Sequence, residues 1–413
     1  MSGIERKAEA LMVDGVPLAD IAKEYGTPLY VYSRDTLEQN WKAFDNAFGN
    51  YPHRVCYAVK ANSNLAVLNV LNQLGSSFDI VSGGELKRVL AAGASADRVV
   101  FSGVGKTSAE MAEALEAGIQ CFNIESLAEA ERLGDVANAH GTVAPVSFRI
   151  NPDVDAQTHP YISTGLKENK FGIAMEEARE AYQNAANHAH LSVCGIDCHI
   201  GSQLTSVDPY EAAFERMLSM VDHLASDGIE LNHIDFGGGQ GIKYSDETPL
   251  DINHWAKAAI AAVGSRNLEI WMEPGRSIAG SAGVLVTQVE YLKRNSEKAF
   301  AIIDGAMNDL IRPALYSAWQ DIVPVVEQPR PSETFDVVGP VCESADFLGK
   351  DRTLAIEAGD YLAVMDSGAY AFVMSSNYNT RGRAAEVMVS GGSAHLVRQR
   401  ESVESLFELE SVI

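Results

Sequence analysis

An eightfold alternation of short apolar runs and helical segments, from residue 54 to about residue 276, constrains the fold of this chain most. The runs are rich in Val, Ile, Phe and Cys, and they read VCYAVKA, SFDIVS, VVFSG, CFNIES, PVSFRINP, VCGIDCHIG, HIDFGGG and EIWMEPGR. Between them, segments such as LAVLNVLNQLG, GELKRVLAAG, SAEMAEALEAG and YEAAFERMLSMVDHLASDG carry apolar residues at three- and four-residue steps. This alternation predicts an α/β protein built on a (β/α)8 TIM barrel.

The pattern changes after the eighth run. The segments GVLVTQVEYL, KAFAIIDGAM, ETFDVVGP, DYLAVMDSGAY and AAEVMVSGG look like strands separated by turns. They predict a mainly β C-terminal domain, to which TPLYVYS at 27–33 adds a strand. We expect the barrel at 35–277 and a β-sandwich or barrel-like domain from 1–34 and 278–413, because 413 residues exceed what one core usually serves.

Composition and charge restrict the class of function. Hydrophobic residues make up 46% of the chain and charged residues 21%, which is typical of a soluble globular enzyme. The formal charge of -24 repels nucleic acid and anionic membranes, so we expect a small-molecule substrate and neither of those partners. The N-terminal MSGIERKAEALMVDG lacks the apolar core of a signal peptide, and no run is apolar enough to span a membrane. A cytoplasmic protein is expected.

The cysteines favour reduced thiols. Five in this length are few and odd in number, which argues against a disulfide framework: Cys56, Cys121, Cys194, Cys198 and Cys342. Cys194 and Cys198 with His199 suggest zinc, but no second ligand pair follows at finger-like spacing. Cys194, Ile196 and Cys198 share one face of a predicted strand, so we interpret both cysteines as packing residues and expect no metal.

Polar residues gather at one end of the predicted barrel. Lys60 ends the first run in YAVKAN, and a lysine at a strand end can simply reach water. However, polar groups recur at or near the carboxyl ends of successive runs: Lys60, Asp79, Glu125, Arg149, His199, the glycines 237–239 and Glu273. Barrel enzymes keep their active sites at this rim, so solvation alone is a poor explanation.

Two glycine-rich stretches raise the question of phosphate binding. GGGQG at 237–241 follows the seventh run, where barrels often bind phosphate through backbone N–H groups, although a tight turn explains it equally well. GVGKT at 103–107 resembles the end of a P-loop, but Val100 stands where that motif requires glycine. We therefore reject a nucleoside triphosphate site.

A rim lysine, a phosphate loop, a carboxylate and an imidazole together suit pyridoxal 5'-phosphate (PLP). The amine of Lys60 can form a Schiff base with the aldehyde, Glu273 can keep the pyridine nitrogen protonated, and the flat ring of His199 can support the cofactor ring. Taken singly, each residue also has a structural explanation. His199 could be a core histidine, Glu273 and Arg276 a local ion pair, and Asp79 a helix cap.

Ten motifs make the chain recognisable. In order they are YAVKAN, FDIVSGGEL, FRINP, STGLKENKFGI, CHIGSQ, DFGGGQGI, EPGRSIAG, DGAMNDLIRPALY, GPVCESAD and GAY. This series closely resembles the diaminopimelate decarboxylases, which share a PLP-dependent fold with alanine racemase and the eukaryotic ornithine decarboxylases. The resemblance implies decarboxylation of meso-2,6-diaminopimelate to L-lysine and CO2, the last step of lysine biosynthesis.

The resemblance also implies residue roles. The catalytic residues would be Lys60, His199, Glu273 and Cys342. The cofactor would be held by Lys60, Asp79, Arg149, His199, Ser202, Gly238, Gly239, Glu273, Pro274, Gly275, Arg276 and Tyr370. Substrate would be bound by Arg276, Arg312, Tyr316, Glu343 and Tyr370. In this family the site lies between two subunits and the segment carrying Cys342 and Glu343 comes from the partner, so a homodimer is implied.

Residue chemistry agrees with these roles. An acid at Glu273 favours electron flow into the ring after CO2 leaves, whereas alanine racemases place an arginine there. Arg276 and Arg312 can bind a distal carboxylate, and Glu343 a distal ammonium group. Cys342 can return a proton to the carbanionic carbon, the structural alternative being a buried inert cysteine.

Three other readings stay open at this point. The chain could decarboxylate another amino acid or polyamine precursor, such as ornithine, arginine or carboxynorspermidine. It could be a non-catalytic PLP carrier, although such carriers are usually a single barrel, or a structural protein, which would leave the polar rim unexplained. STGLKENKFGI, between the fifth and sixth runs, is interpreted as a loop that closes over substrate.

Overall fold

The computed structural model describes residues 3–154 and 170–413, which form two compact units. One unit consists of Asn40–Ile242 and Thr248–Ser277, and the other of Met1–Gln39, Lys243–Glu247 and Ile278–Ile413. Part of the expected closing loop, residues 163–169, lies outside the described residues. In the part of the chain that is described, no helix has both the length and the apolar character needed to cross a membrane.

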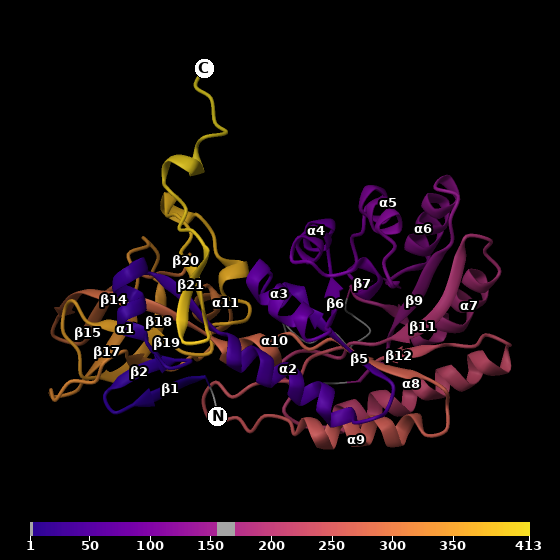
Figure 1. Cartoon of the computed structure of the whole chain (residues 1–413), viewed down its shortest axis with the longest axis horizontal. Coiled ribbons are helices and arrows are strands. Elements are labelled where there is room, and N and C mark those ends of the chain that lie inside the picture. The colour runs from indigo at the N-terminus through magenta and orange to yellow at the C-terminus, as the bar shows by residue number, and fades with distance from the viewer. Residues whose placement is uncertain (1–2, 155–169) are drawn as a thin grey trace. The chain divides into compact units, whose positions relative to one another are not determined.

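The first unit is a closed barrel of eight parallel strands (Figure 1). Around the ring the order is β9, β11, β12, β13, β5, β6, β7 and β8, and β8 pairs again with β9. The strands are β5 (His53–Ala58), β6 (Ser77–Ile80), β7 (Val99–Phe101), β8 (Cys121–Ile124), β9 (Ala144–Asn151), β11 (Leu191–Asp197), β12 (His233–Asp235) and β13 (Glu269–Met272). Each predicted run supplies one strand, so the barrel prediction is confirmed. A short strand, β10 (Ile173–Ala174), pairs with β9 outside the ring.

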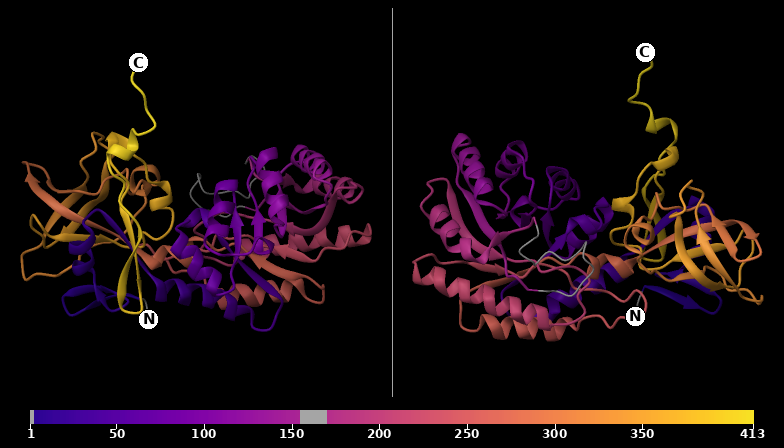
Figure 2. Two further views of the ribbon diagram at one scale, coloured as in Figure 1. Left: turned by 45° about the horizontal axis from the view of Figure 1, so that its top comes forward. Right: turned by 180° about the vertical axis from the view of Figure 1, so that it is seen from behind.

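Helices cover the outside of these strands (Figures 1 and 2). They are α2 (Arg34–Phe48), α3 (Leu65–Gln73), α4 (Gly83–Ala91), α5 (Ser108–Ala117), α6 (Leu127–Ala139), α7 (Met175–Ala186), α8 (Asp208–Ser226) and α9 (Ile252–Val263), and a four-residue helix, α10 (Arg276–Ala279), follows β13 along the chain. Local sequence fixes their ends. In α5, Thr107 and Glu110 form a reciprocal capping box, and Gly118 ends the helix in the left-handed conformation at φ 74°.

Burial on both faces explains why the barrel runs are almost continuously apolar. All four residues of β6 and of β8 are buried, because the helices cover one face and the barrel interior fills the other. On the outside, Phe214 of α8 packs on Phe236 with ring centroids 4.3 Å apart and on Trp255 of α9 at 6.0 Å. Burying such a side chain contributes about 1.5–3 kcal/mol.

The second unit is mainly β. Its larger sheet runs in the order β18, β17, β15, β14, β4, β20 and β21, with β19 pairing both β14 and β16. The strands are β4 (Leu29–Ser33), β14 (Gly283–Arg294), β15 (Ala299–Ile303), β16 (Ile322–Pro324), β17 (Glu333–Val338), β18 (Phe347–Leu354), β19 (Tyr361–Val364), β20 (Ala385–Ser390) and β21 (Ser393–Arg398). A separate sheet holds β1 (Ile4–Lys7), β2 (Ala10–Val13) and β3 (Val16–Pro17), and helix α1 (Leu18–Tyr25) follows it directly; helix α11 (Arg312–Tyr316) lies between β15 and β16 in the sequence.

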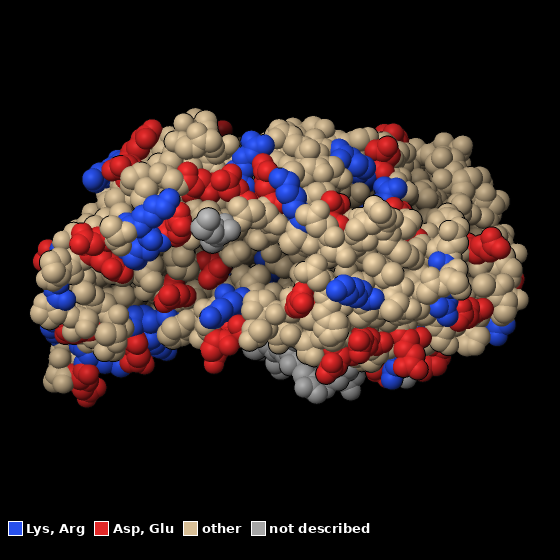
Figure 3. Space-filling view, turned by 60° about the horizontal axis from the view of Figure 1, so that its bottom comes forward, with Lys and Arg blue, Asp and Glu red and all other residues tan. Residues whose placement is uncertain are grey.

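Every segment predicted as a strand of this unit contains one. The stretch TPLYVYS supplies β4, which pairs antiparallel with β14 and parallel with β20. The mainly β prediction is therefore confirmed, while β1 to β3, β16, β18 and β21 were not predicted. On the face drawn in Figure 3, acidic and basic side chains are interspersed.

Candidate active site

Lys60 and Asp79 form an ion pair at the carboxyl-terminal rim of the barrel. Lys60 lies in a single 3-10 turn, Val59–Ala61, which directly follows β5. Its Nζ donates to Oδ2 of Asp79 at 2.7 Å, and the Asp79 side chain is fully buried while that of Lys60 is 36% exposed. Asp79 lies within β6, and Ser82 caps the next helix, so Asp79 is not the helix cap that we considered. The ion pair thus holds the primary amine of Lys60 at the rim, where part of the side chain remains accessible to solvent.

Three buried carboxyl groups lie together inside the barrel. Asp197 ends β11, Asp235 ends β12 and Glu273 follows β13, and one oxygen of each lies within 4.8 Å of the others. Burial raises the pKa of Asp235 to about 7 and raises the pKa of Glu273 well above its usual range, with neighbouring carboxylates adding to the effect. A cation placed against this cluster would reverse both shifts.

Neutral side chains complete the surroundings of Glu273. Its Oε1 accepts from the hydroxyl of Ser102 and from the side-chain amide of Asn123, both at 3.4 Å. These donors come from the carboxyl ends of β7 and β8, which meet at the same rim. They fix the direction of the carboxyl group.

His199 lies against the glycine loop. It follows β11, and its Nδ1 accepts from the backbone N–H of Gly238 at 3.2 Å. Burial and the nearby cations of Arg149 and Lys60 lower the pKa of His199 well below its usual range. The ring is therefore a neutral, flat imidazole at working pH.

The glycine loop leaves no room for side chains. A Cβ at Gly238 would lie 2.1 Å from the carbonyl oxygen of Glu273, and one at Gly239 would lie 2.3 Å from the carbonyl oxygen of Gly201. Gly239 also has φ +100°, a conformation that favours glycine. Near the loop, Arg276 Nη2 donates to Ser202 Oγ at 3.2 Å.

Arg149 also lies at the rim of the barrel. It lies near the end of β9, with its guanidinium over the ring of Phe171 at 4.9 Å and Nη1 3.4 Å from Glu125 Oε1. Glu125 in turn accepts from the backbone N–H groups of Gly103 and Gly172, each at 3.0 Å. Lys106 of the rejected P-loop stretch is buried and bound to Glu129 at 2.6 Å.

Pro274 and Gly275 directly follow Glu273 in the barrel unit, and the other predicted residues belong to the second unit. Arg312 begins α11 and places its guanidinium over the ring of Tyr244 at 4.5 Å, while Tyr316 ends this helix. Glu343 accepts from the hydroxyl of Tyr378 at 2.5 Å, and Tyr370 has φ 53°. Cys342 is exposed, so the alternative of a buried inert cysteine is wrong.

Several rim residues were missed by sequence reasoning. Asp197 and Asp235 stand at strand ends in CGIDCHIG and HIDFGGG, so the same rule that selected Glu273 could have selected them. No sequence pattern within FDIVSGGEL distinguished Glu85 as a candidate site residue. Its Oε2 accepts from the Val81 N–H at 2.7 Å, and burial raises its pKa to about 7.

The cysteine interpretation needs one correction. The register between β11 and β9 shifts between Val193 and Gly195, so the strict alternation expected for Cys194, Ile196 and Cys198 is not kept. Cys198 lies just after β11 and is buried, as a packing residue should be. Cys194 is partly buried and also packs, against the core cluster that contains Cys121, with the two Sγ atoms 3.5 Å apart.

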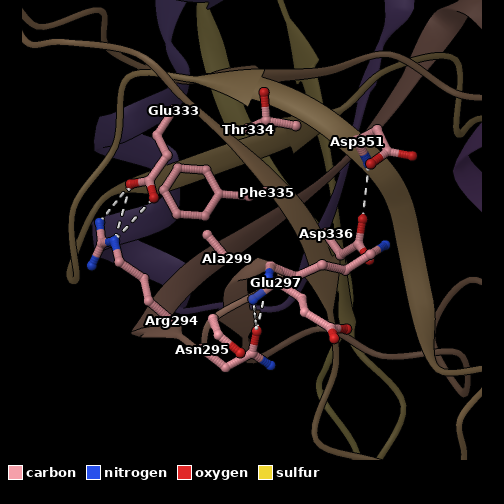
Figure 4. A pocket seen from close by; sticks show the side chains of 11 residues that line it. Arg294, Asn295, Glu297, Ala299, Glu333, Thr334, Phe335, Asp336 and Asp351 are labelled. Atoms are coloured by element: carbon pink, nitrogen blue, oxygen red, sulfur yellow. Dashed lines mark hydrogen bonds and ion pairs between the residues drawn. The ribbon is translucent and has the colours of Figure 1, made fainter.

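One pocket lies away from the rim, on the second unit (Figure 4). It measures about 440 Å³ and is lined by residues of β14, β15, β17 and β18 and of the turn between β14 and β15. Its opposite charges are paired, Arg294 with Glu333 and Lys298 with Asp336, each at 2.7 Å. We assign it no catalytic role.

The rim residues fit PLP. Lys60 supplies a primary amine, the loop at Gly238 and Gly239 admits a ligand against bare backbone, and the buried acids around Glu273 suit a protonated ring nitrogen. The neutral ring of His199 can support an aromatic face. These observations concern the barrel unit alone.

Comparisons with known proteins agree with this geometry. Residues 34–280 match the family described as pyridoxal-dependent decarboxylase, pyridoxal binding domain. Diaminopimelate decarboxylase of Vibrio cholerae is 60% identical over 98% of this chain and 97% of its own length, and that of Pseudomonas aeruginosa is 58% identical over 99% and 98%. The crystal structure of diaminopimelate decarboxylase from Helicobacter pylori complexed with L-lysine is 41% identical, with TM-score 0.92 over 95% of this chain and 98% of that one.

Fold and family match thus define a PLP-dependent barrel enzyme, and the PLP prediction is confirmed. Because this chain is 60% identical to a decarboxylase over nearly its whole length, the alternative of a structural protein is wrong. The chain belongs to the diaminopimelate decarboxylase family. The resemblance drawn from the ten motifs is confirmed.

Proposed function

We propose that this enzyme decarboxylates meso-2,6-diaminopimelate to L-lysine and CO2, the last step of lysine biosynthesis. The observation that carries the proposal is the rim arrangement of Lys60, Asp79 and Glu273 in a chain of this family. The L-lysine in the structure of the Helicobacter pylori relative supports lysine as the product. We also propose that the enzyme acts in the cytoplasm.

Lys60 is proposed as the residue that holds the cofactor covalently. The pairing of its Nζ with buried Asp79 supports this role, because the carboxylate fixes the amine at the rim. When bound, PLP supplies an electron sink for the pair left by the departing CO2. Glu273 then has the task of holding a proton on the ring nitrogen, and Ser202, Arg276 and the segment from Gly238 to Gly239 bind the phosphate.

The remaining cofactor contacts follow from the resemblance. His199 is proposed to support the ring face, and its neutral state avoids repulsion of a protonated ring. Asp79, Arg149, Pro274, Gly275 and Tyr370 are proposed to complete the cofactor site.

Substrate selection is proposed to rest on charge. Arg276 and Arg312 would bind the distal carboxylate by charge-assisted hydrogen bonds, and Glu343 would accept from the distal ammonium group, with Tyr316 and Tyr370 beside them. The stacking of Arg312 on Tyr244 supports this role, because it holds the planar guanidinium in one orientation. Ornithine and arginine lack a distal carboxylate, so they would leave one arginine without a partner.

Cys342 is proposed as the proton donor, supplied by a second copy of the chain in a homodimer. Its exposure within the single chain, together with the exposure of Glu343, supports a position where a second subunit can be reached. The thiol gives its proton to the carbon that lost CO2, and solvent then restores the thiol.

A mass-spectrometric assay tests the proposal. The purified PLP-loaded enzyme is incubated with each diaminopimelate stereoisomer, ornithine and arginine, and lysine, putrescine and agmatine are measured. Lysine from the meso isomer alone is expected. Formation of putrescine or agmatine would agree with the proposed cofactor chemistry but contradict the proposed roles of Arg312 and Glu343. If no product formed, a non-catalytic PLP carrier would be favoured.

A further inference from the structure

A second cluster of chemically active side chains lies inside the barrel, away from the rim. Cys121 is the first residue of β8, His233 is the first residue of β12, and Cys194 stands at the register shift of β11. One ligand atom from each lies within 4.8 Å of the others, and the two Sγ atoms are 3.5 Å apart. Because Lys60 and Glu273 follow the opposite ends of their strands, this cluster is distinct from the cofactor site.

The cluster is in the barrel interior. Cys121 packs with Cys56, Val100 and Trp271, which come from other strands of the ring, and Cys194 packs against the same group. Strands on different sides of a barrel can share such contacts only through its interior. Cys194 is only partly buried, so the cluster has a route to solvent.

His233 is the observation that points to a ligand. Its ring stacks on Trp271 with centroids 3.5 Å apart and an interplanar angle of 7°, and the residue is 3% exposed. Its Nε2 is buried, and among the described residues it has no hydrogen-bond partner. A buried nitrogen without a partner costs free energy that a bound ligand would recover.

The neighbouring backbone holds this nitrogen in place. A Cβ at Gly195 would lie 2.0 Å from Nε2 of His233, so only glycine lets the ring approach β11 beside Cys194. The backbone of β11 thus positions the imidazole of His233 beside the thiol of Cys194, with one ligand atom of each within 4.8 Å of the other.

We propose that Cys121, Cys194 and His233 bind one zinc-type divalent cation at the amino-terminal end of the barrel. Two thiolates and one imidazole are a ligand set that zinc prefers, and sulfurs about 2.3 Å from a tetrahedral ion lie about 3.8 Å apart, close to the observed 3.5 Å. A water molecule entering beside Cys194 would fill the fourth position.

Binding requires that both thiols lose their protons. In the metal-free state the Sγ of Cys121 donates to the carbonyl of Phe122 at 3.6 Å, and that of Cys194 to the carbonyl of Val146 at 3.3 Å. The cation replaces these two protons, which pass to solvent, so the charge of the site is unchanged. No oxidant or reductant is involved.

A disulfide between the two cysteines fits the topology less well. Strand β9 lies between β8 and β11, so the two Cα atoms are separated by about two strand spacings, or roughly 9–10 Å. Disulfides need Cα atoms within about 7 Å. An ion between the sulfurs spans this separation without moving the backbone.

Cobalt substitution tests the site in the intact PLP enzyme. The reduced protein is freed of metal with a chelator and titrated with Co(II), and the visible bands of tetrahedral thiolate-bound cobalt are followed. We expect one ion per chain, displaced by Zn(II). Cys121→Ser and Cys194→Ser should each weaken binding by at least about tenfold, because each removes one of the three protein ligands.

Control variants separate this site from other thiols. Cys56→Ser alters a cysteine of the same core cluster that is not one of the three ligands, so it should bind cobalt like the wild type. Cys342→Ser removes the exposed thiol and should also leave the titration unchanged. Loss of the cobalt signal in Cys342→Ser alone would overturn the proposal, as would no stoichiometric binding by the wild type.

A measurement on the unmodified protein covers the case in which a variant fails to fold. Alkylation of Cys194 is followed by mass spectrometry with and without Zn(II). We expect zinc to slow alkylation of Cys194 at least about tenfold while leaving that of Cys342 unchanged. Equal alkylation rates with and without Zn(II) would contradict the proposed site. So would a Cys121–Cys194 disulfide that forms under mild oxidation in a protein that binds no metal.

Discussion

The Nζ atom of Lys60 lies 2.7 Å from Oδ2 of Asp79, which is fully buried in the second strand of the barrel. A buried carboxylate of this kind needs a cation, and here the cation is the amine proposed to carry the cofactor. Lys60 therefore both neutralises a buried carboxylate and provides the amine proposed to bind the cofactor.

Lys60→Ala should abolish both cofactor attachment and turnover. Without the amine no covalent bond to PLP can form, so we expect loss of the visible absorbance of lysine-bound cofactor and a fall in kcat of at least about a thousandfold. Spectra and lysine production are measured together. Lys87→Ala, which removes an exposed lysine paired with Glu113, is the matched control and should behave like the wild type.

Glu273→Gln should lower kcat with less effect on cofactor content. Glutamine can still accept from Ser102 and Asn123 but cannot hold a proton on the ring nitrogen as a carboxylate does. Losing such an electrostatic contact costs about 10²–10³ in kcat. Single-turnover kinetics on the PLP-loaded variant check this, and a rate within twofold of the wild type would remove Glu273 from its proposed role.

Glu85 should make stability depend on pH. Burial raises its pKa from 4.5 to about 7, so the folded protein binds this proton more tightly than the unfolded chain does. The resulting stabilisation is complete below about pH 4.5 and is lost as pH rises through 7, by about 3 kcal/mol at most. Urea unfolding of Glu85→Gln should show a smaller decline over this range, whereas Glu113→Gln should follow the wild type.

Gly238→Ala should weaken cofactor binding. Its Cβ would lie 2.1 Å from the carbonyl oxygen of Glu273, so the loop must shift, at a cost of about 1–3 kcal/mol. PLP dissociation is measured by absorbance after dialysis. Gly105→Ala adds the same methyl group where no atom lies within 4 Å, and unchanged PLP retention is expected there.

Arg312→Gln should raise the KM for diaminopimelate. A charge-assisted hydrogen bond contributes about 1.5–3 kcal/mol, which corresponds to roughly 10- to 100-fold. Initial-rate kinetics with the meso isomer measure the change, and cofactor absorbance should be preserved. Arg294→Gln, in a surface ion pair with Glu333, serves as the control, and an equal KM in both variants would contradict the substrate role of Arg312.

The strands that were not predicted show where the alternation of apolar residues fails to identify a strand. Strands β18 and β21 lie at the two ends of the larger sheet, and β18 carries Lys350, Asp351 and Arg352 in succession. Edge strands keep charged residues because one side of their backbone is unpaired, which disturbs the apolar alternation that identifies a strand. The central strands β4 and β20, like the first half of β14, were predictable because strands pair with both of their edges and their side chains are buried, so these stretches stay apolar.

The barrel, the mainly β unit and the family could all be inferred from the amino-acid sequence, because strand and helix periodicities and ordered motifs are local properties of the chain. Which side chains meet in space depends on the folded chain. Asp197, Asp235 and Glu273 come from three successive strands of the ring, and their shared burial, which raises the pKa of each, exists only when the barrel closes. The contact of Cys121, Cys194 and His233 likewise depends on a register shift that no local pattern reveals, since hydrogen bonding between distant strands sets it.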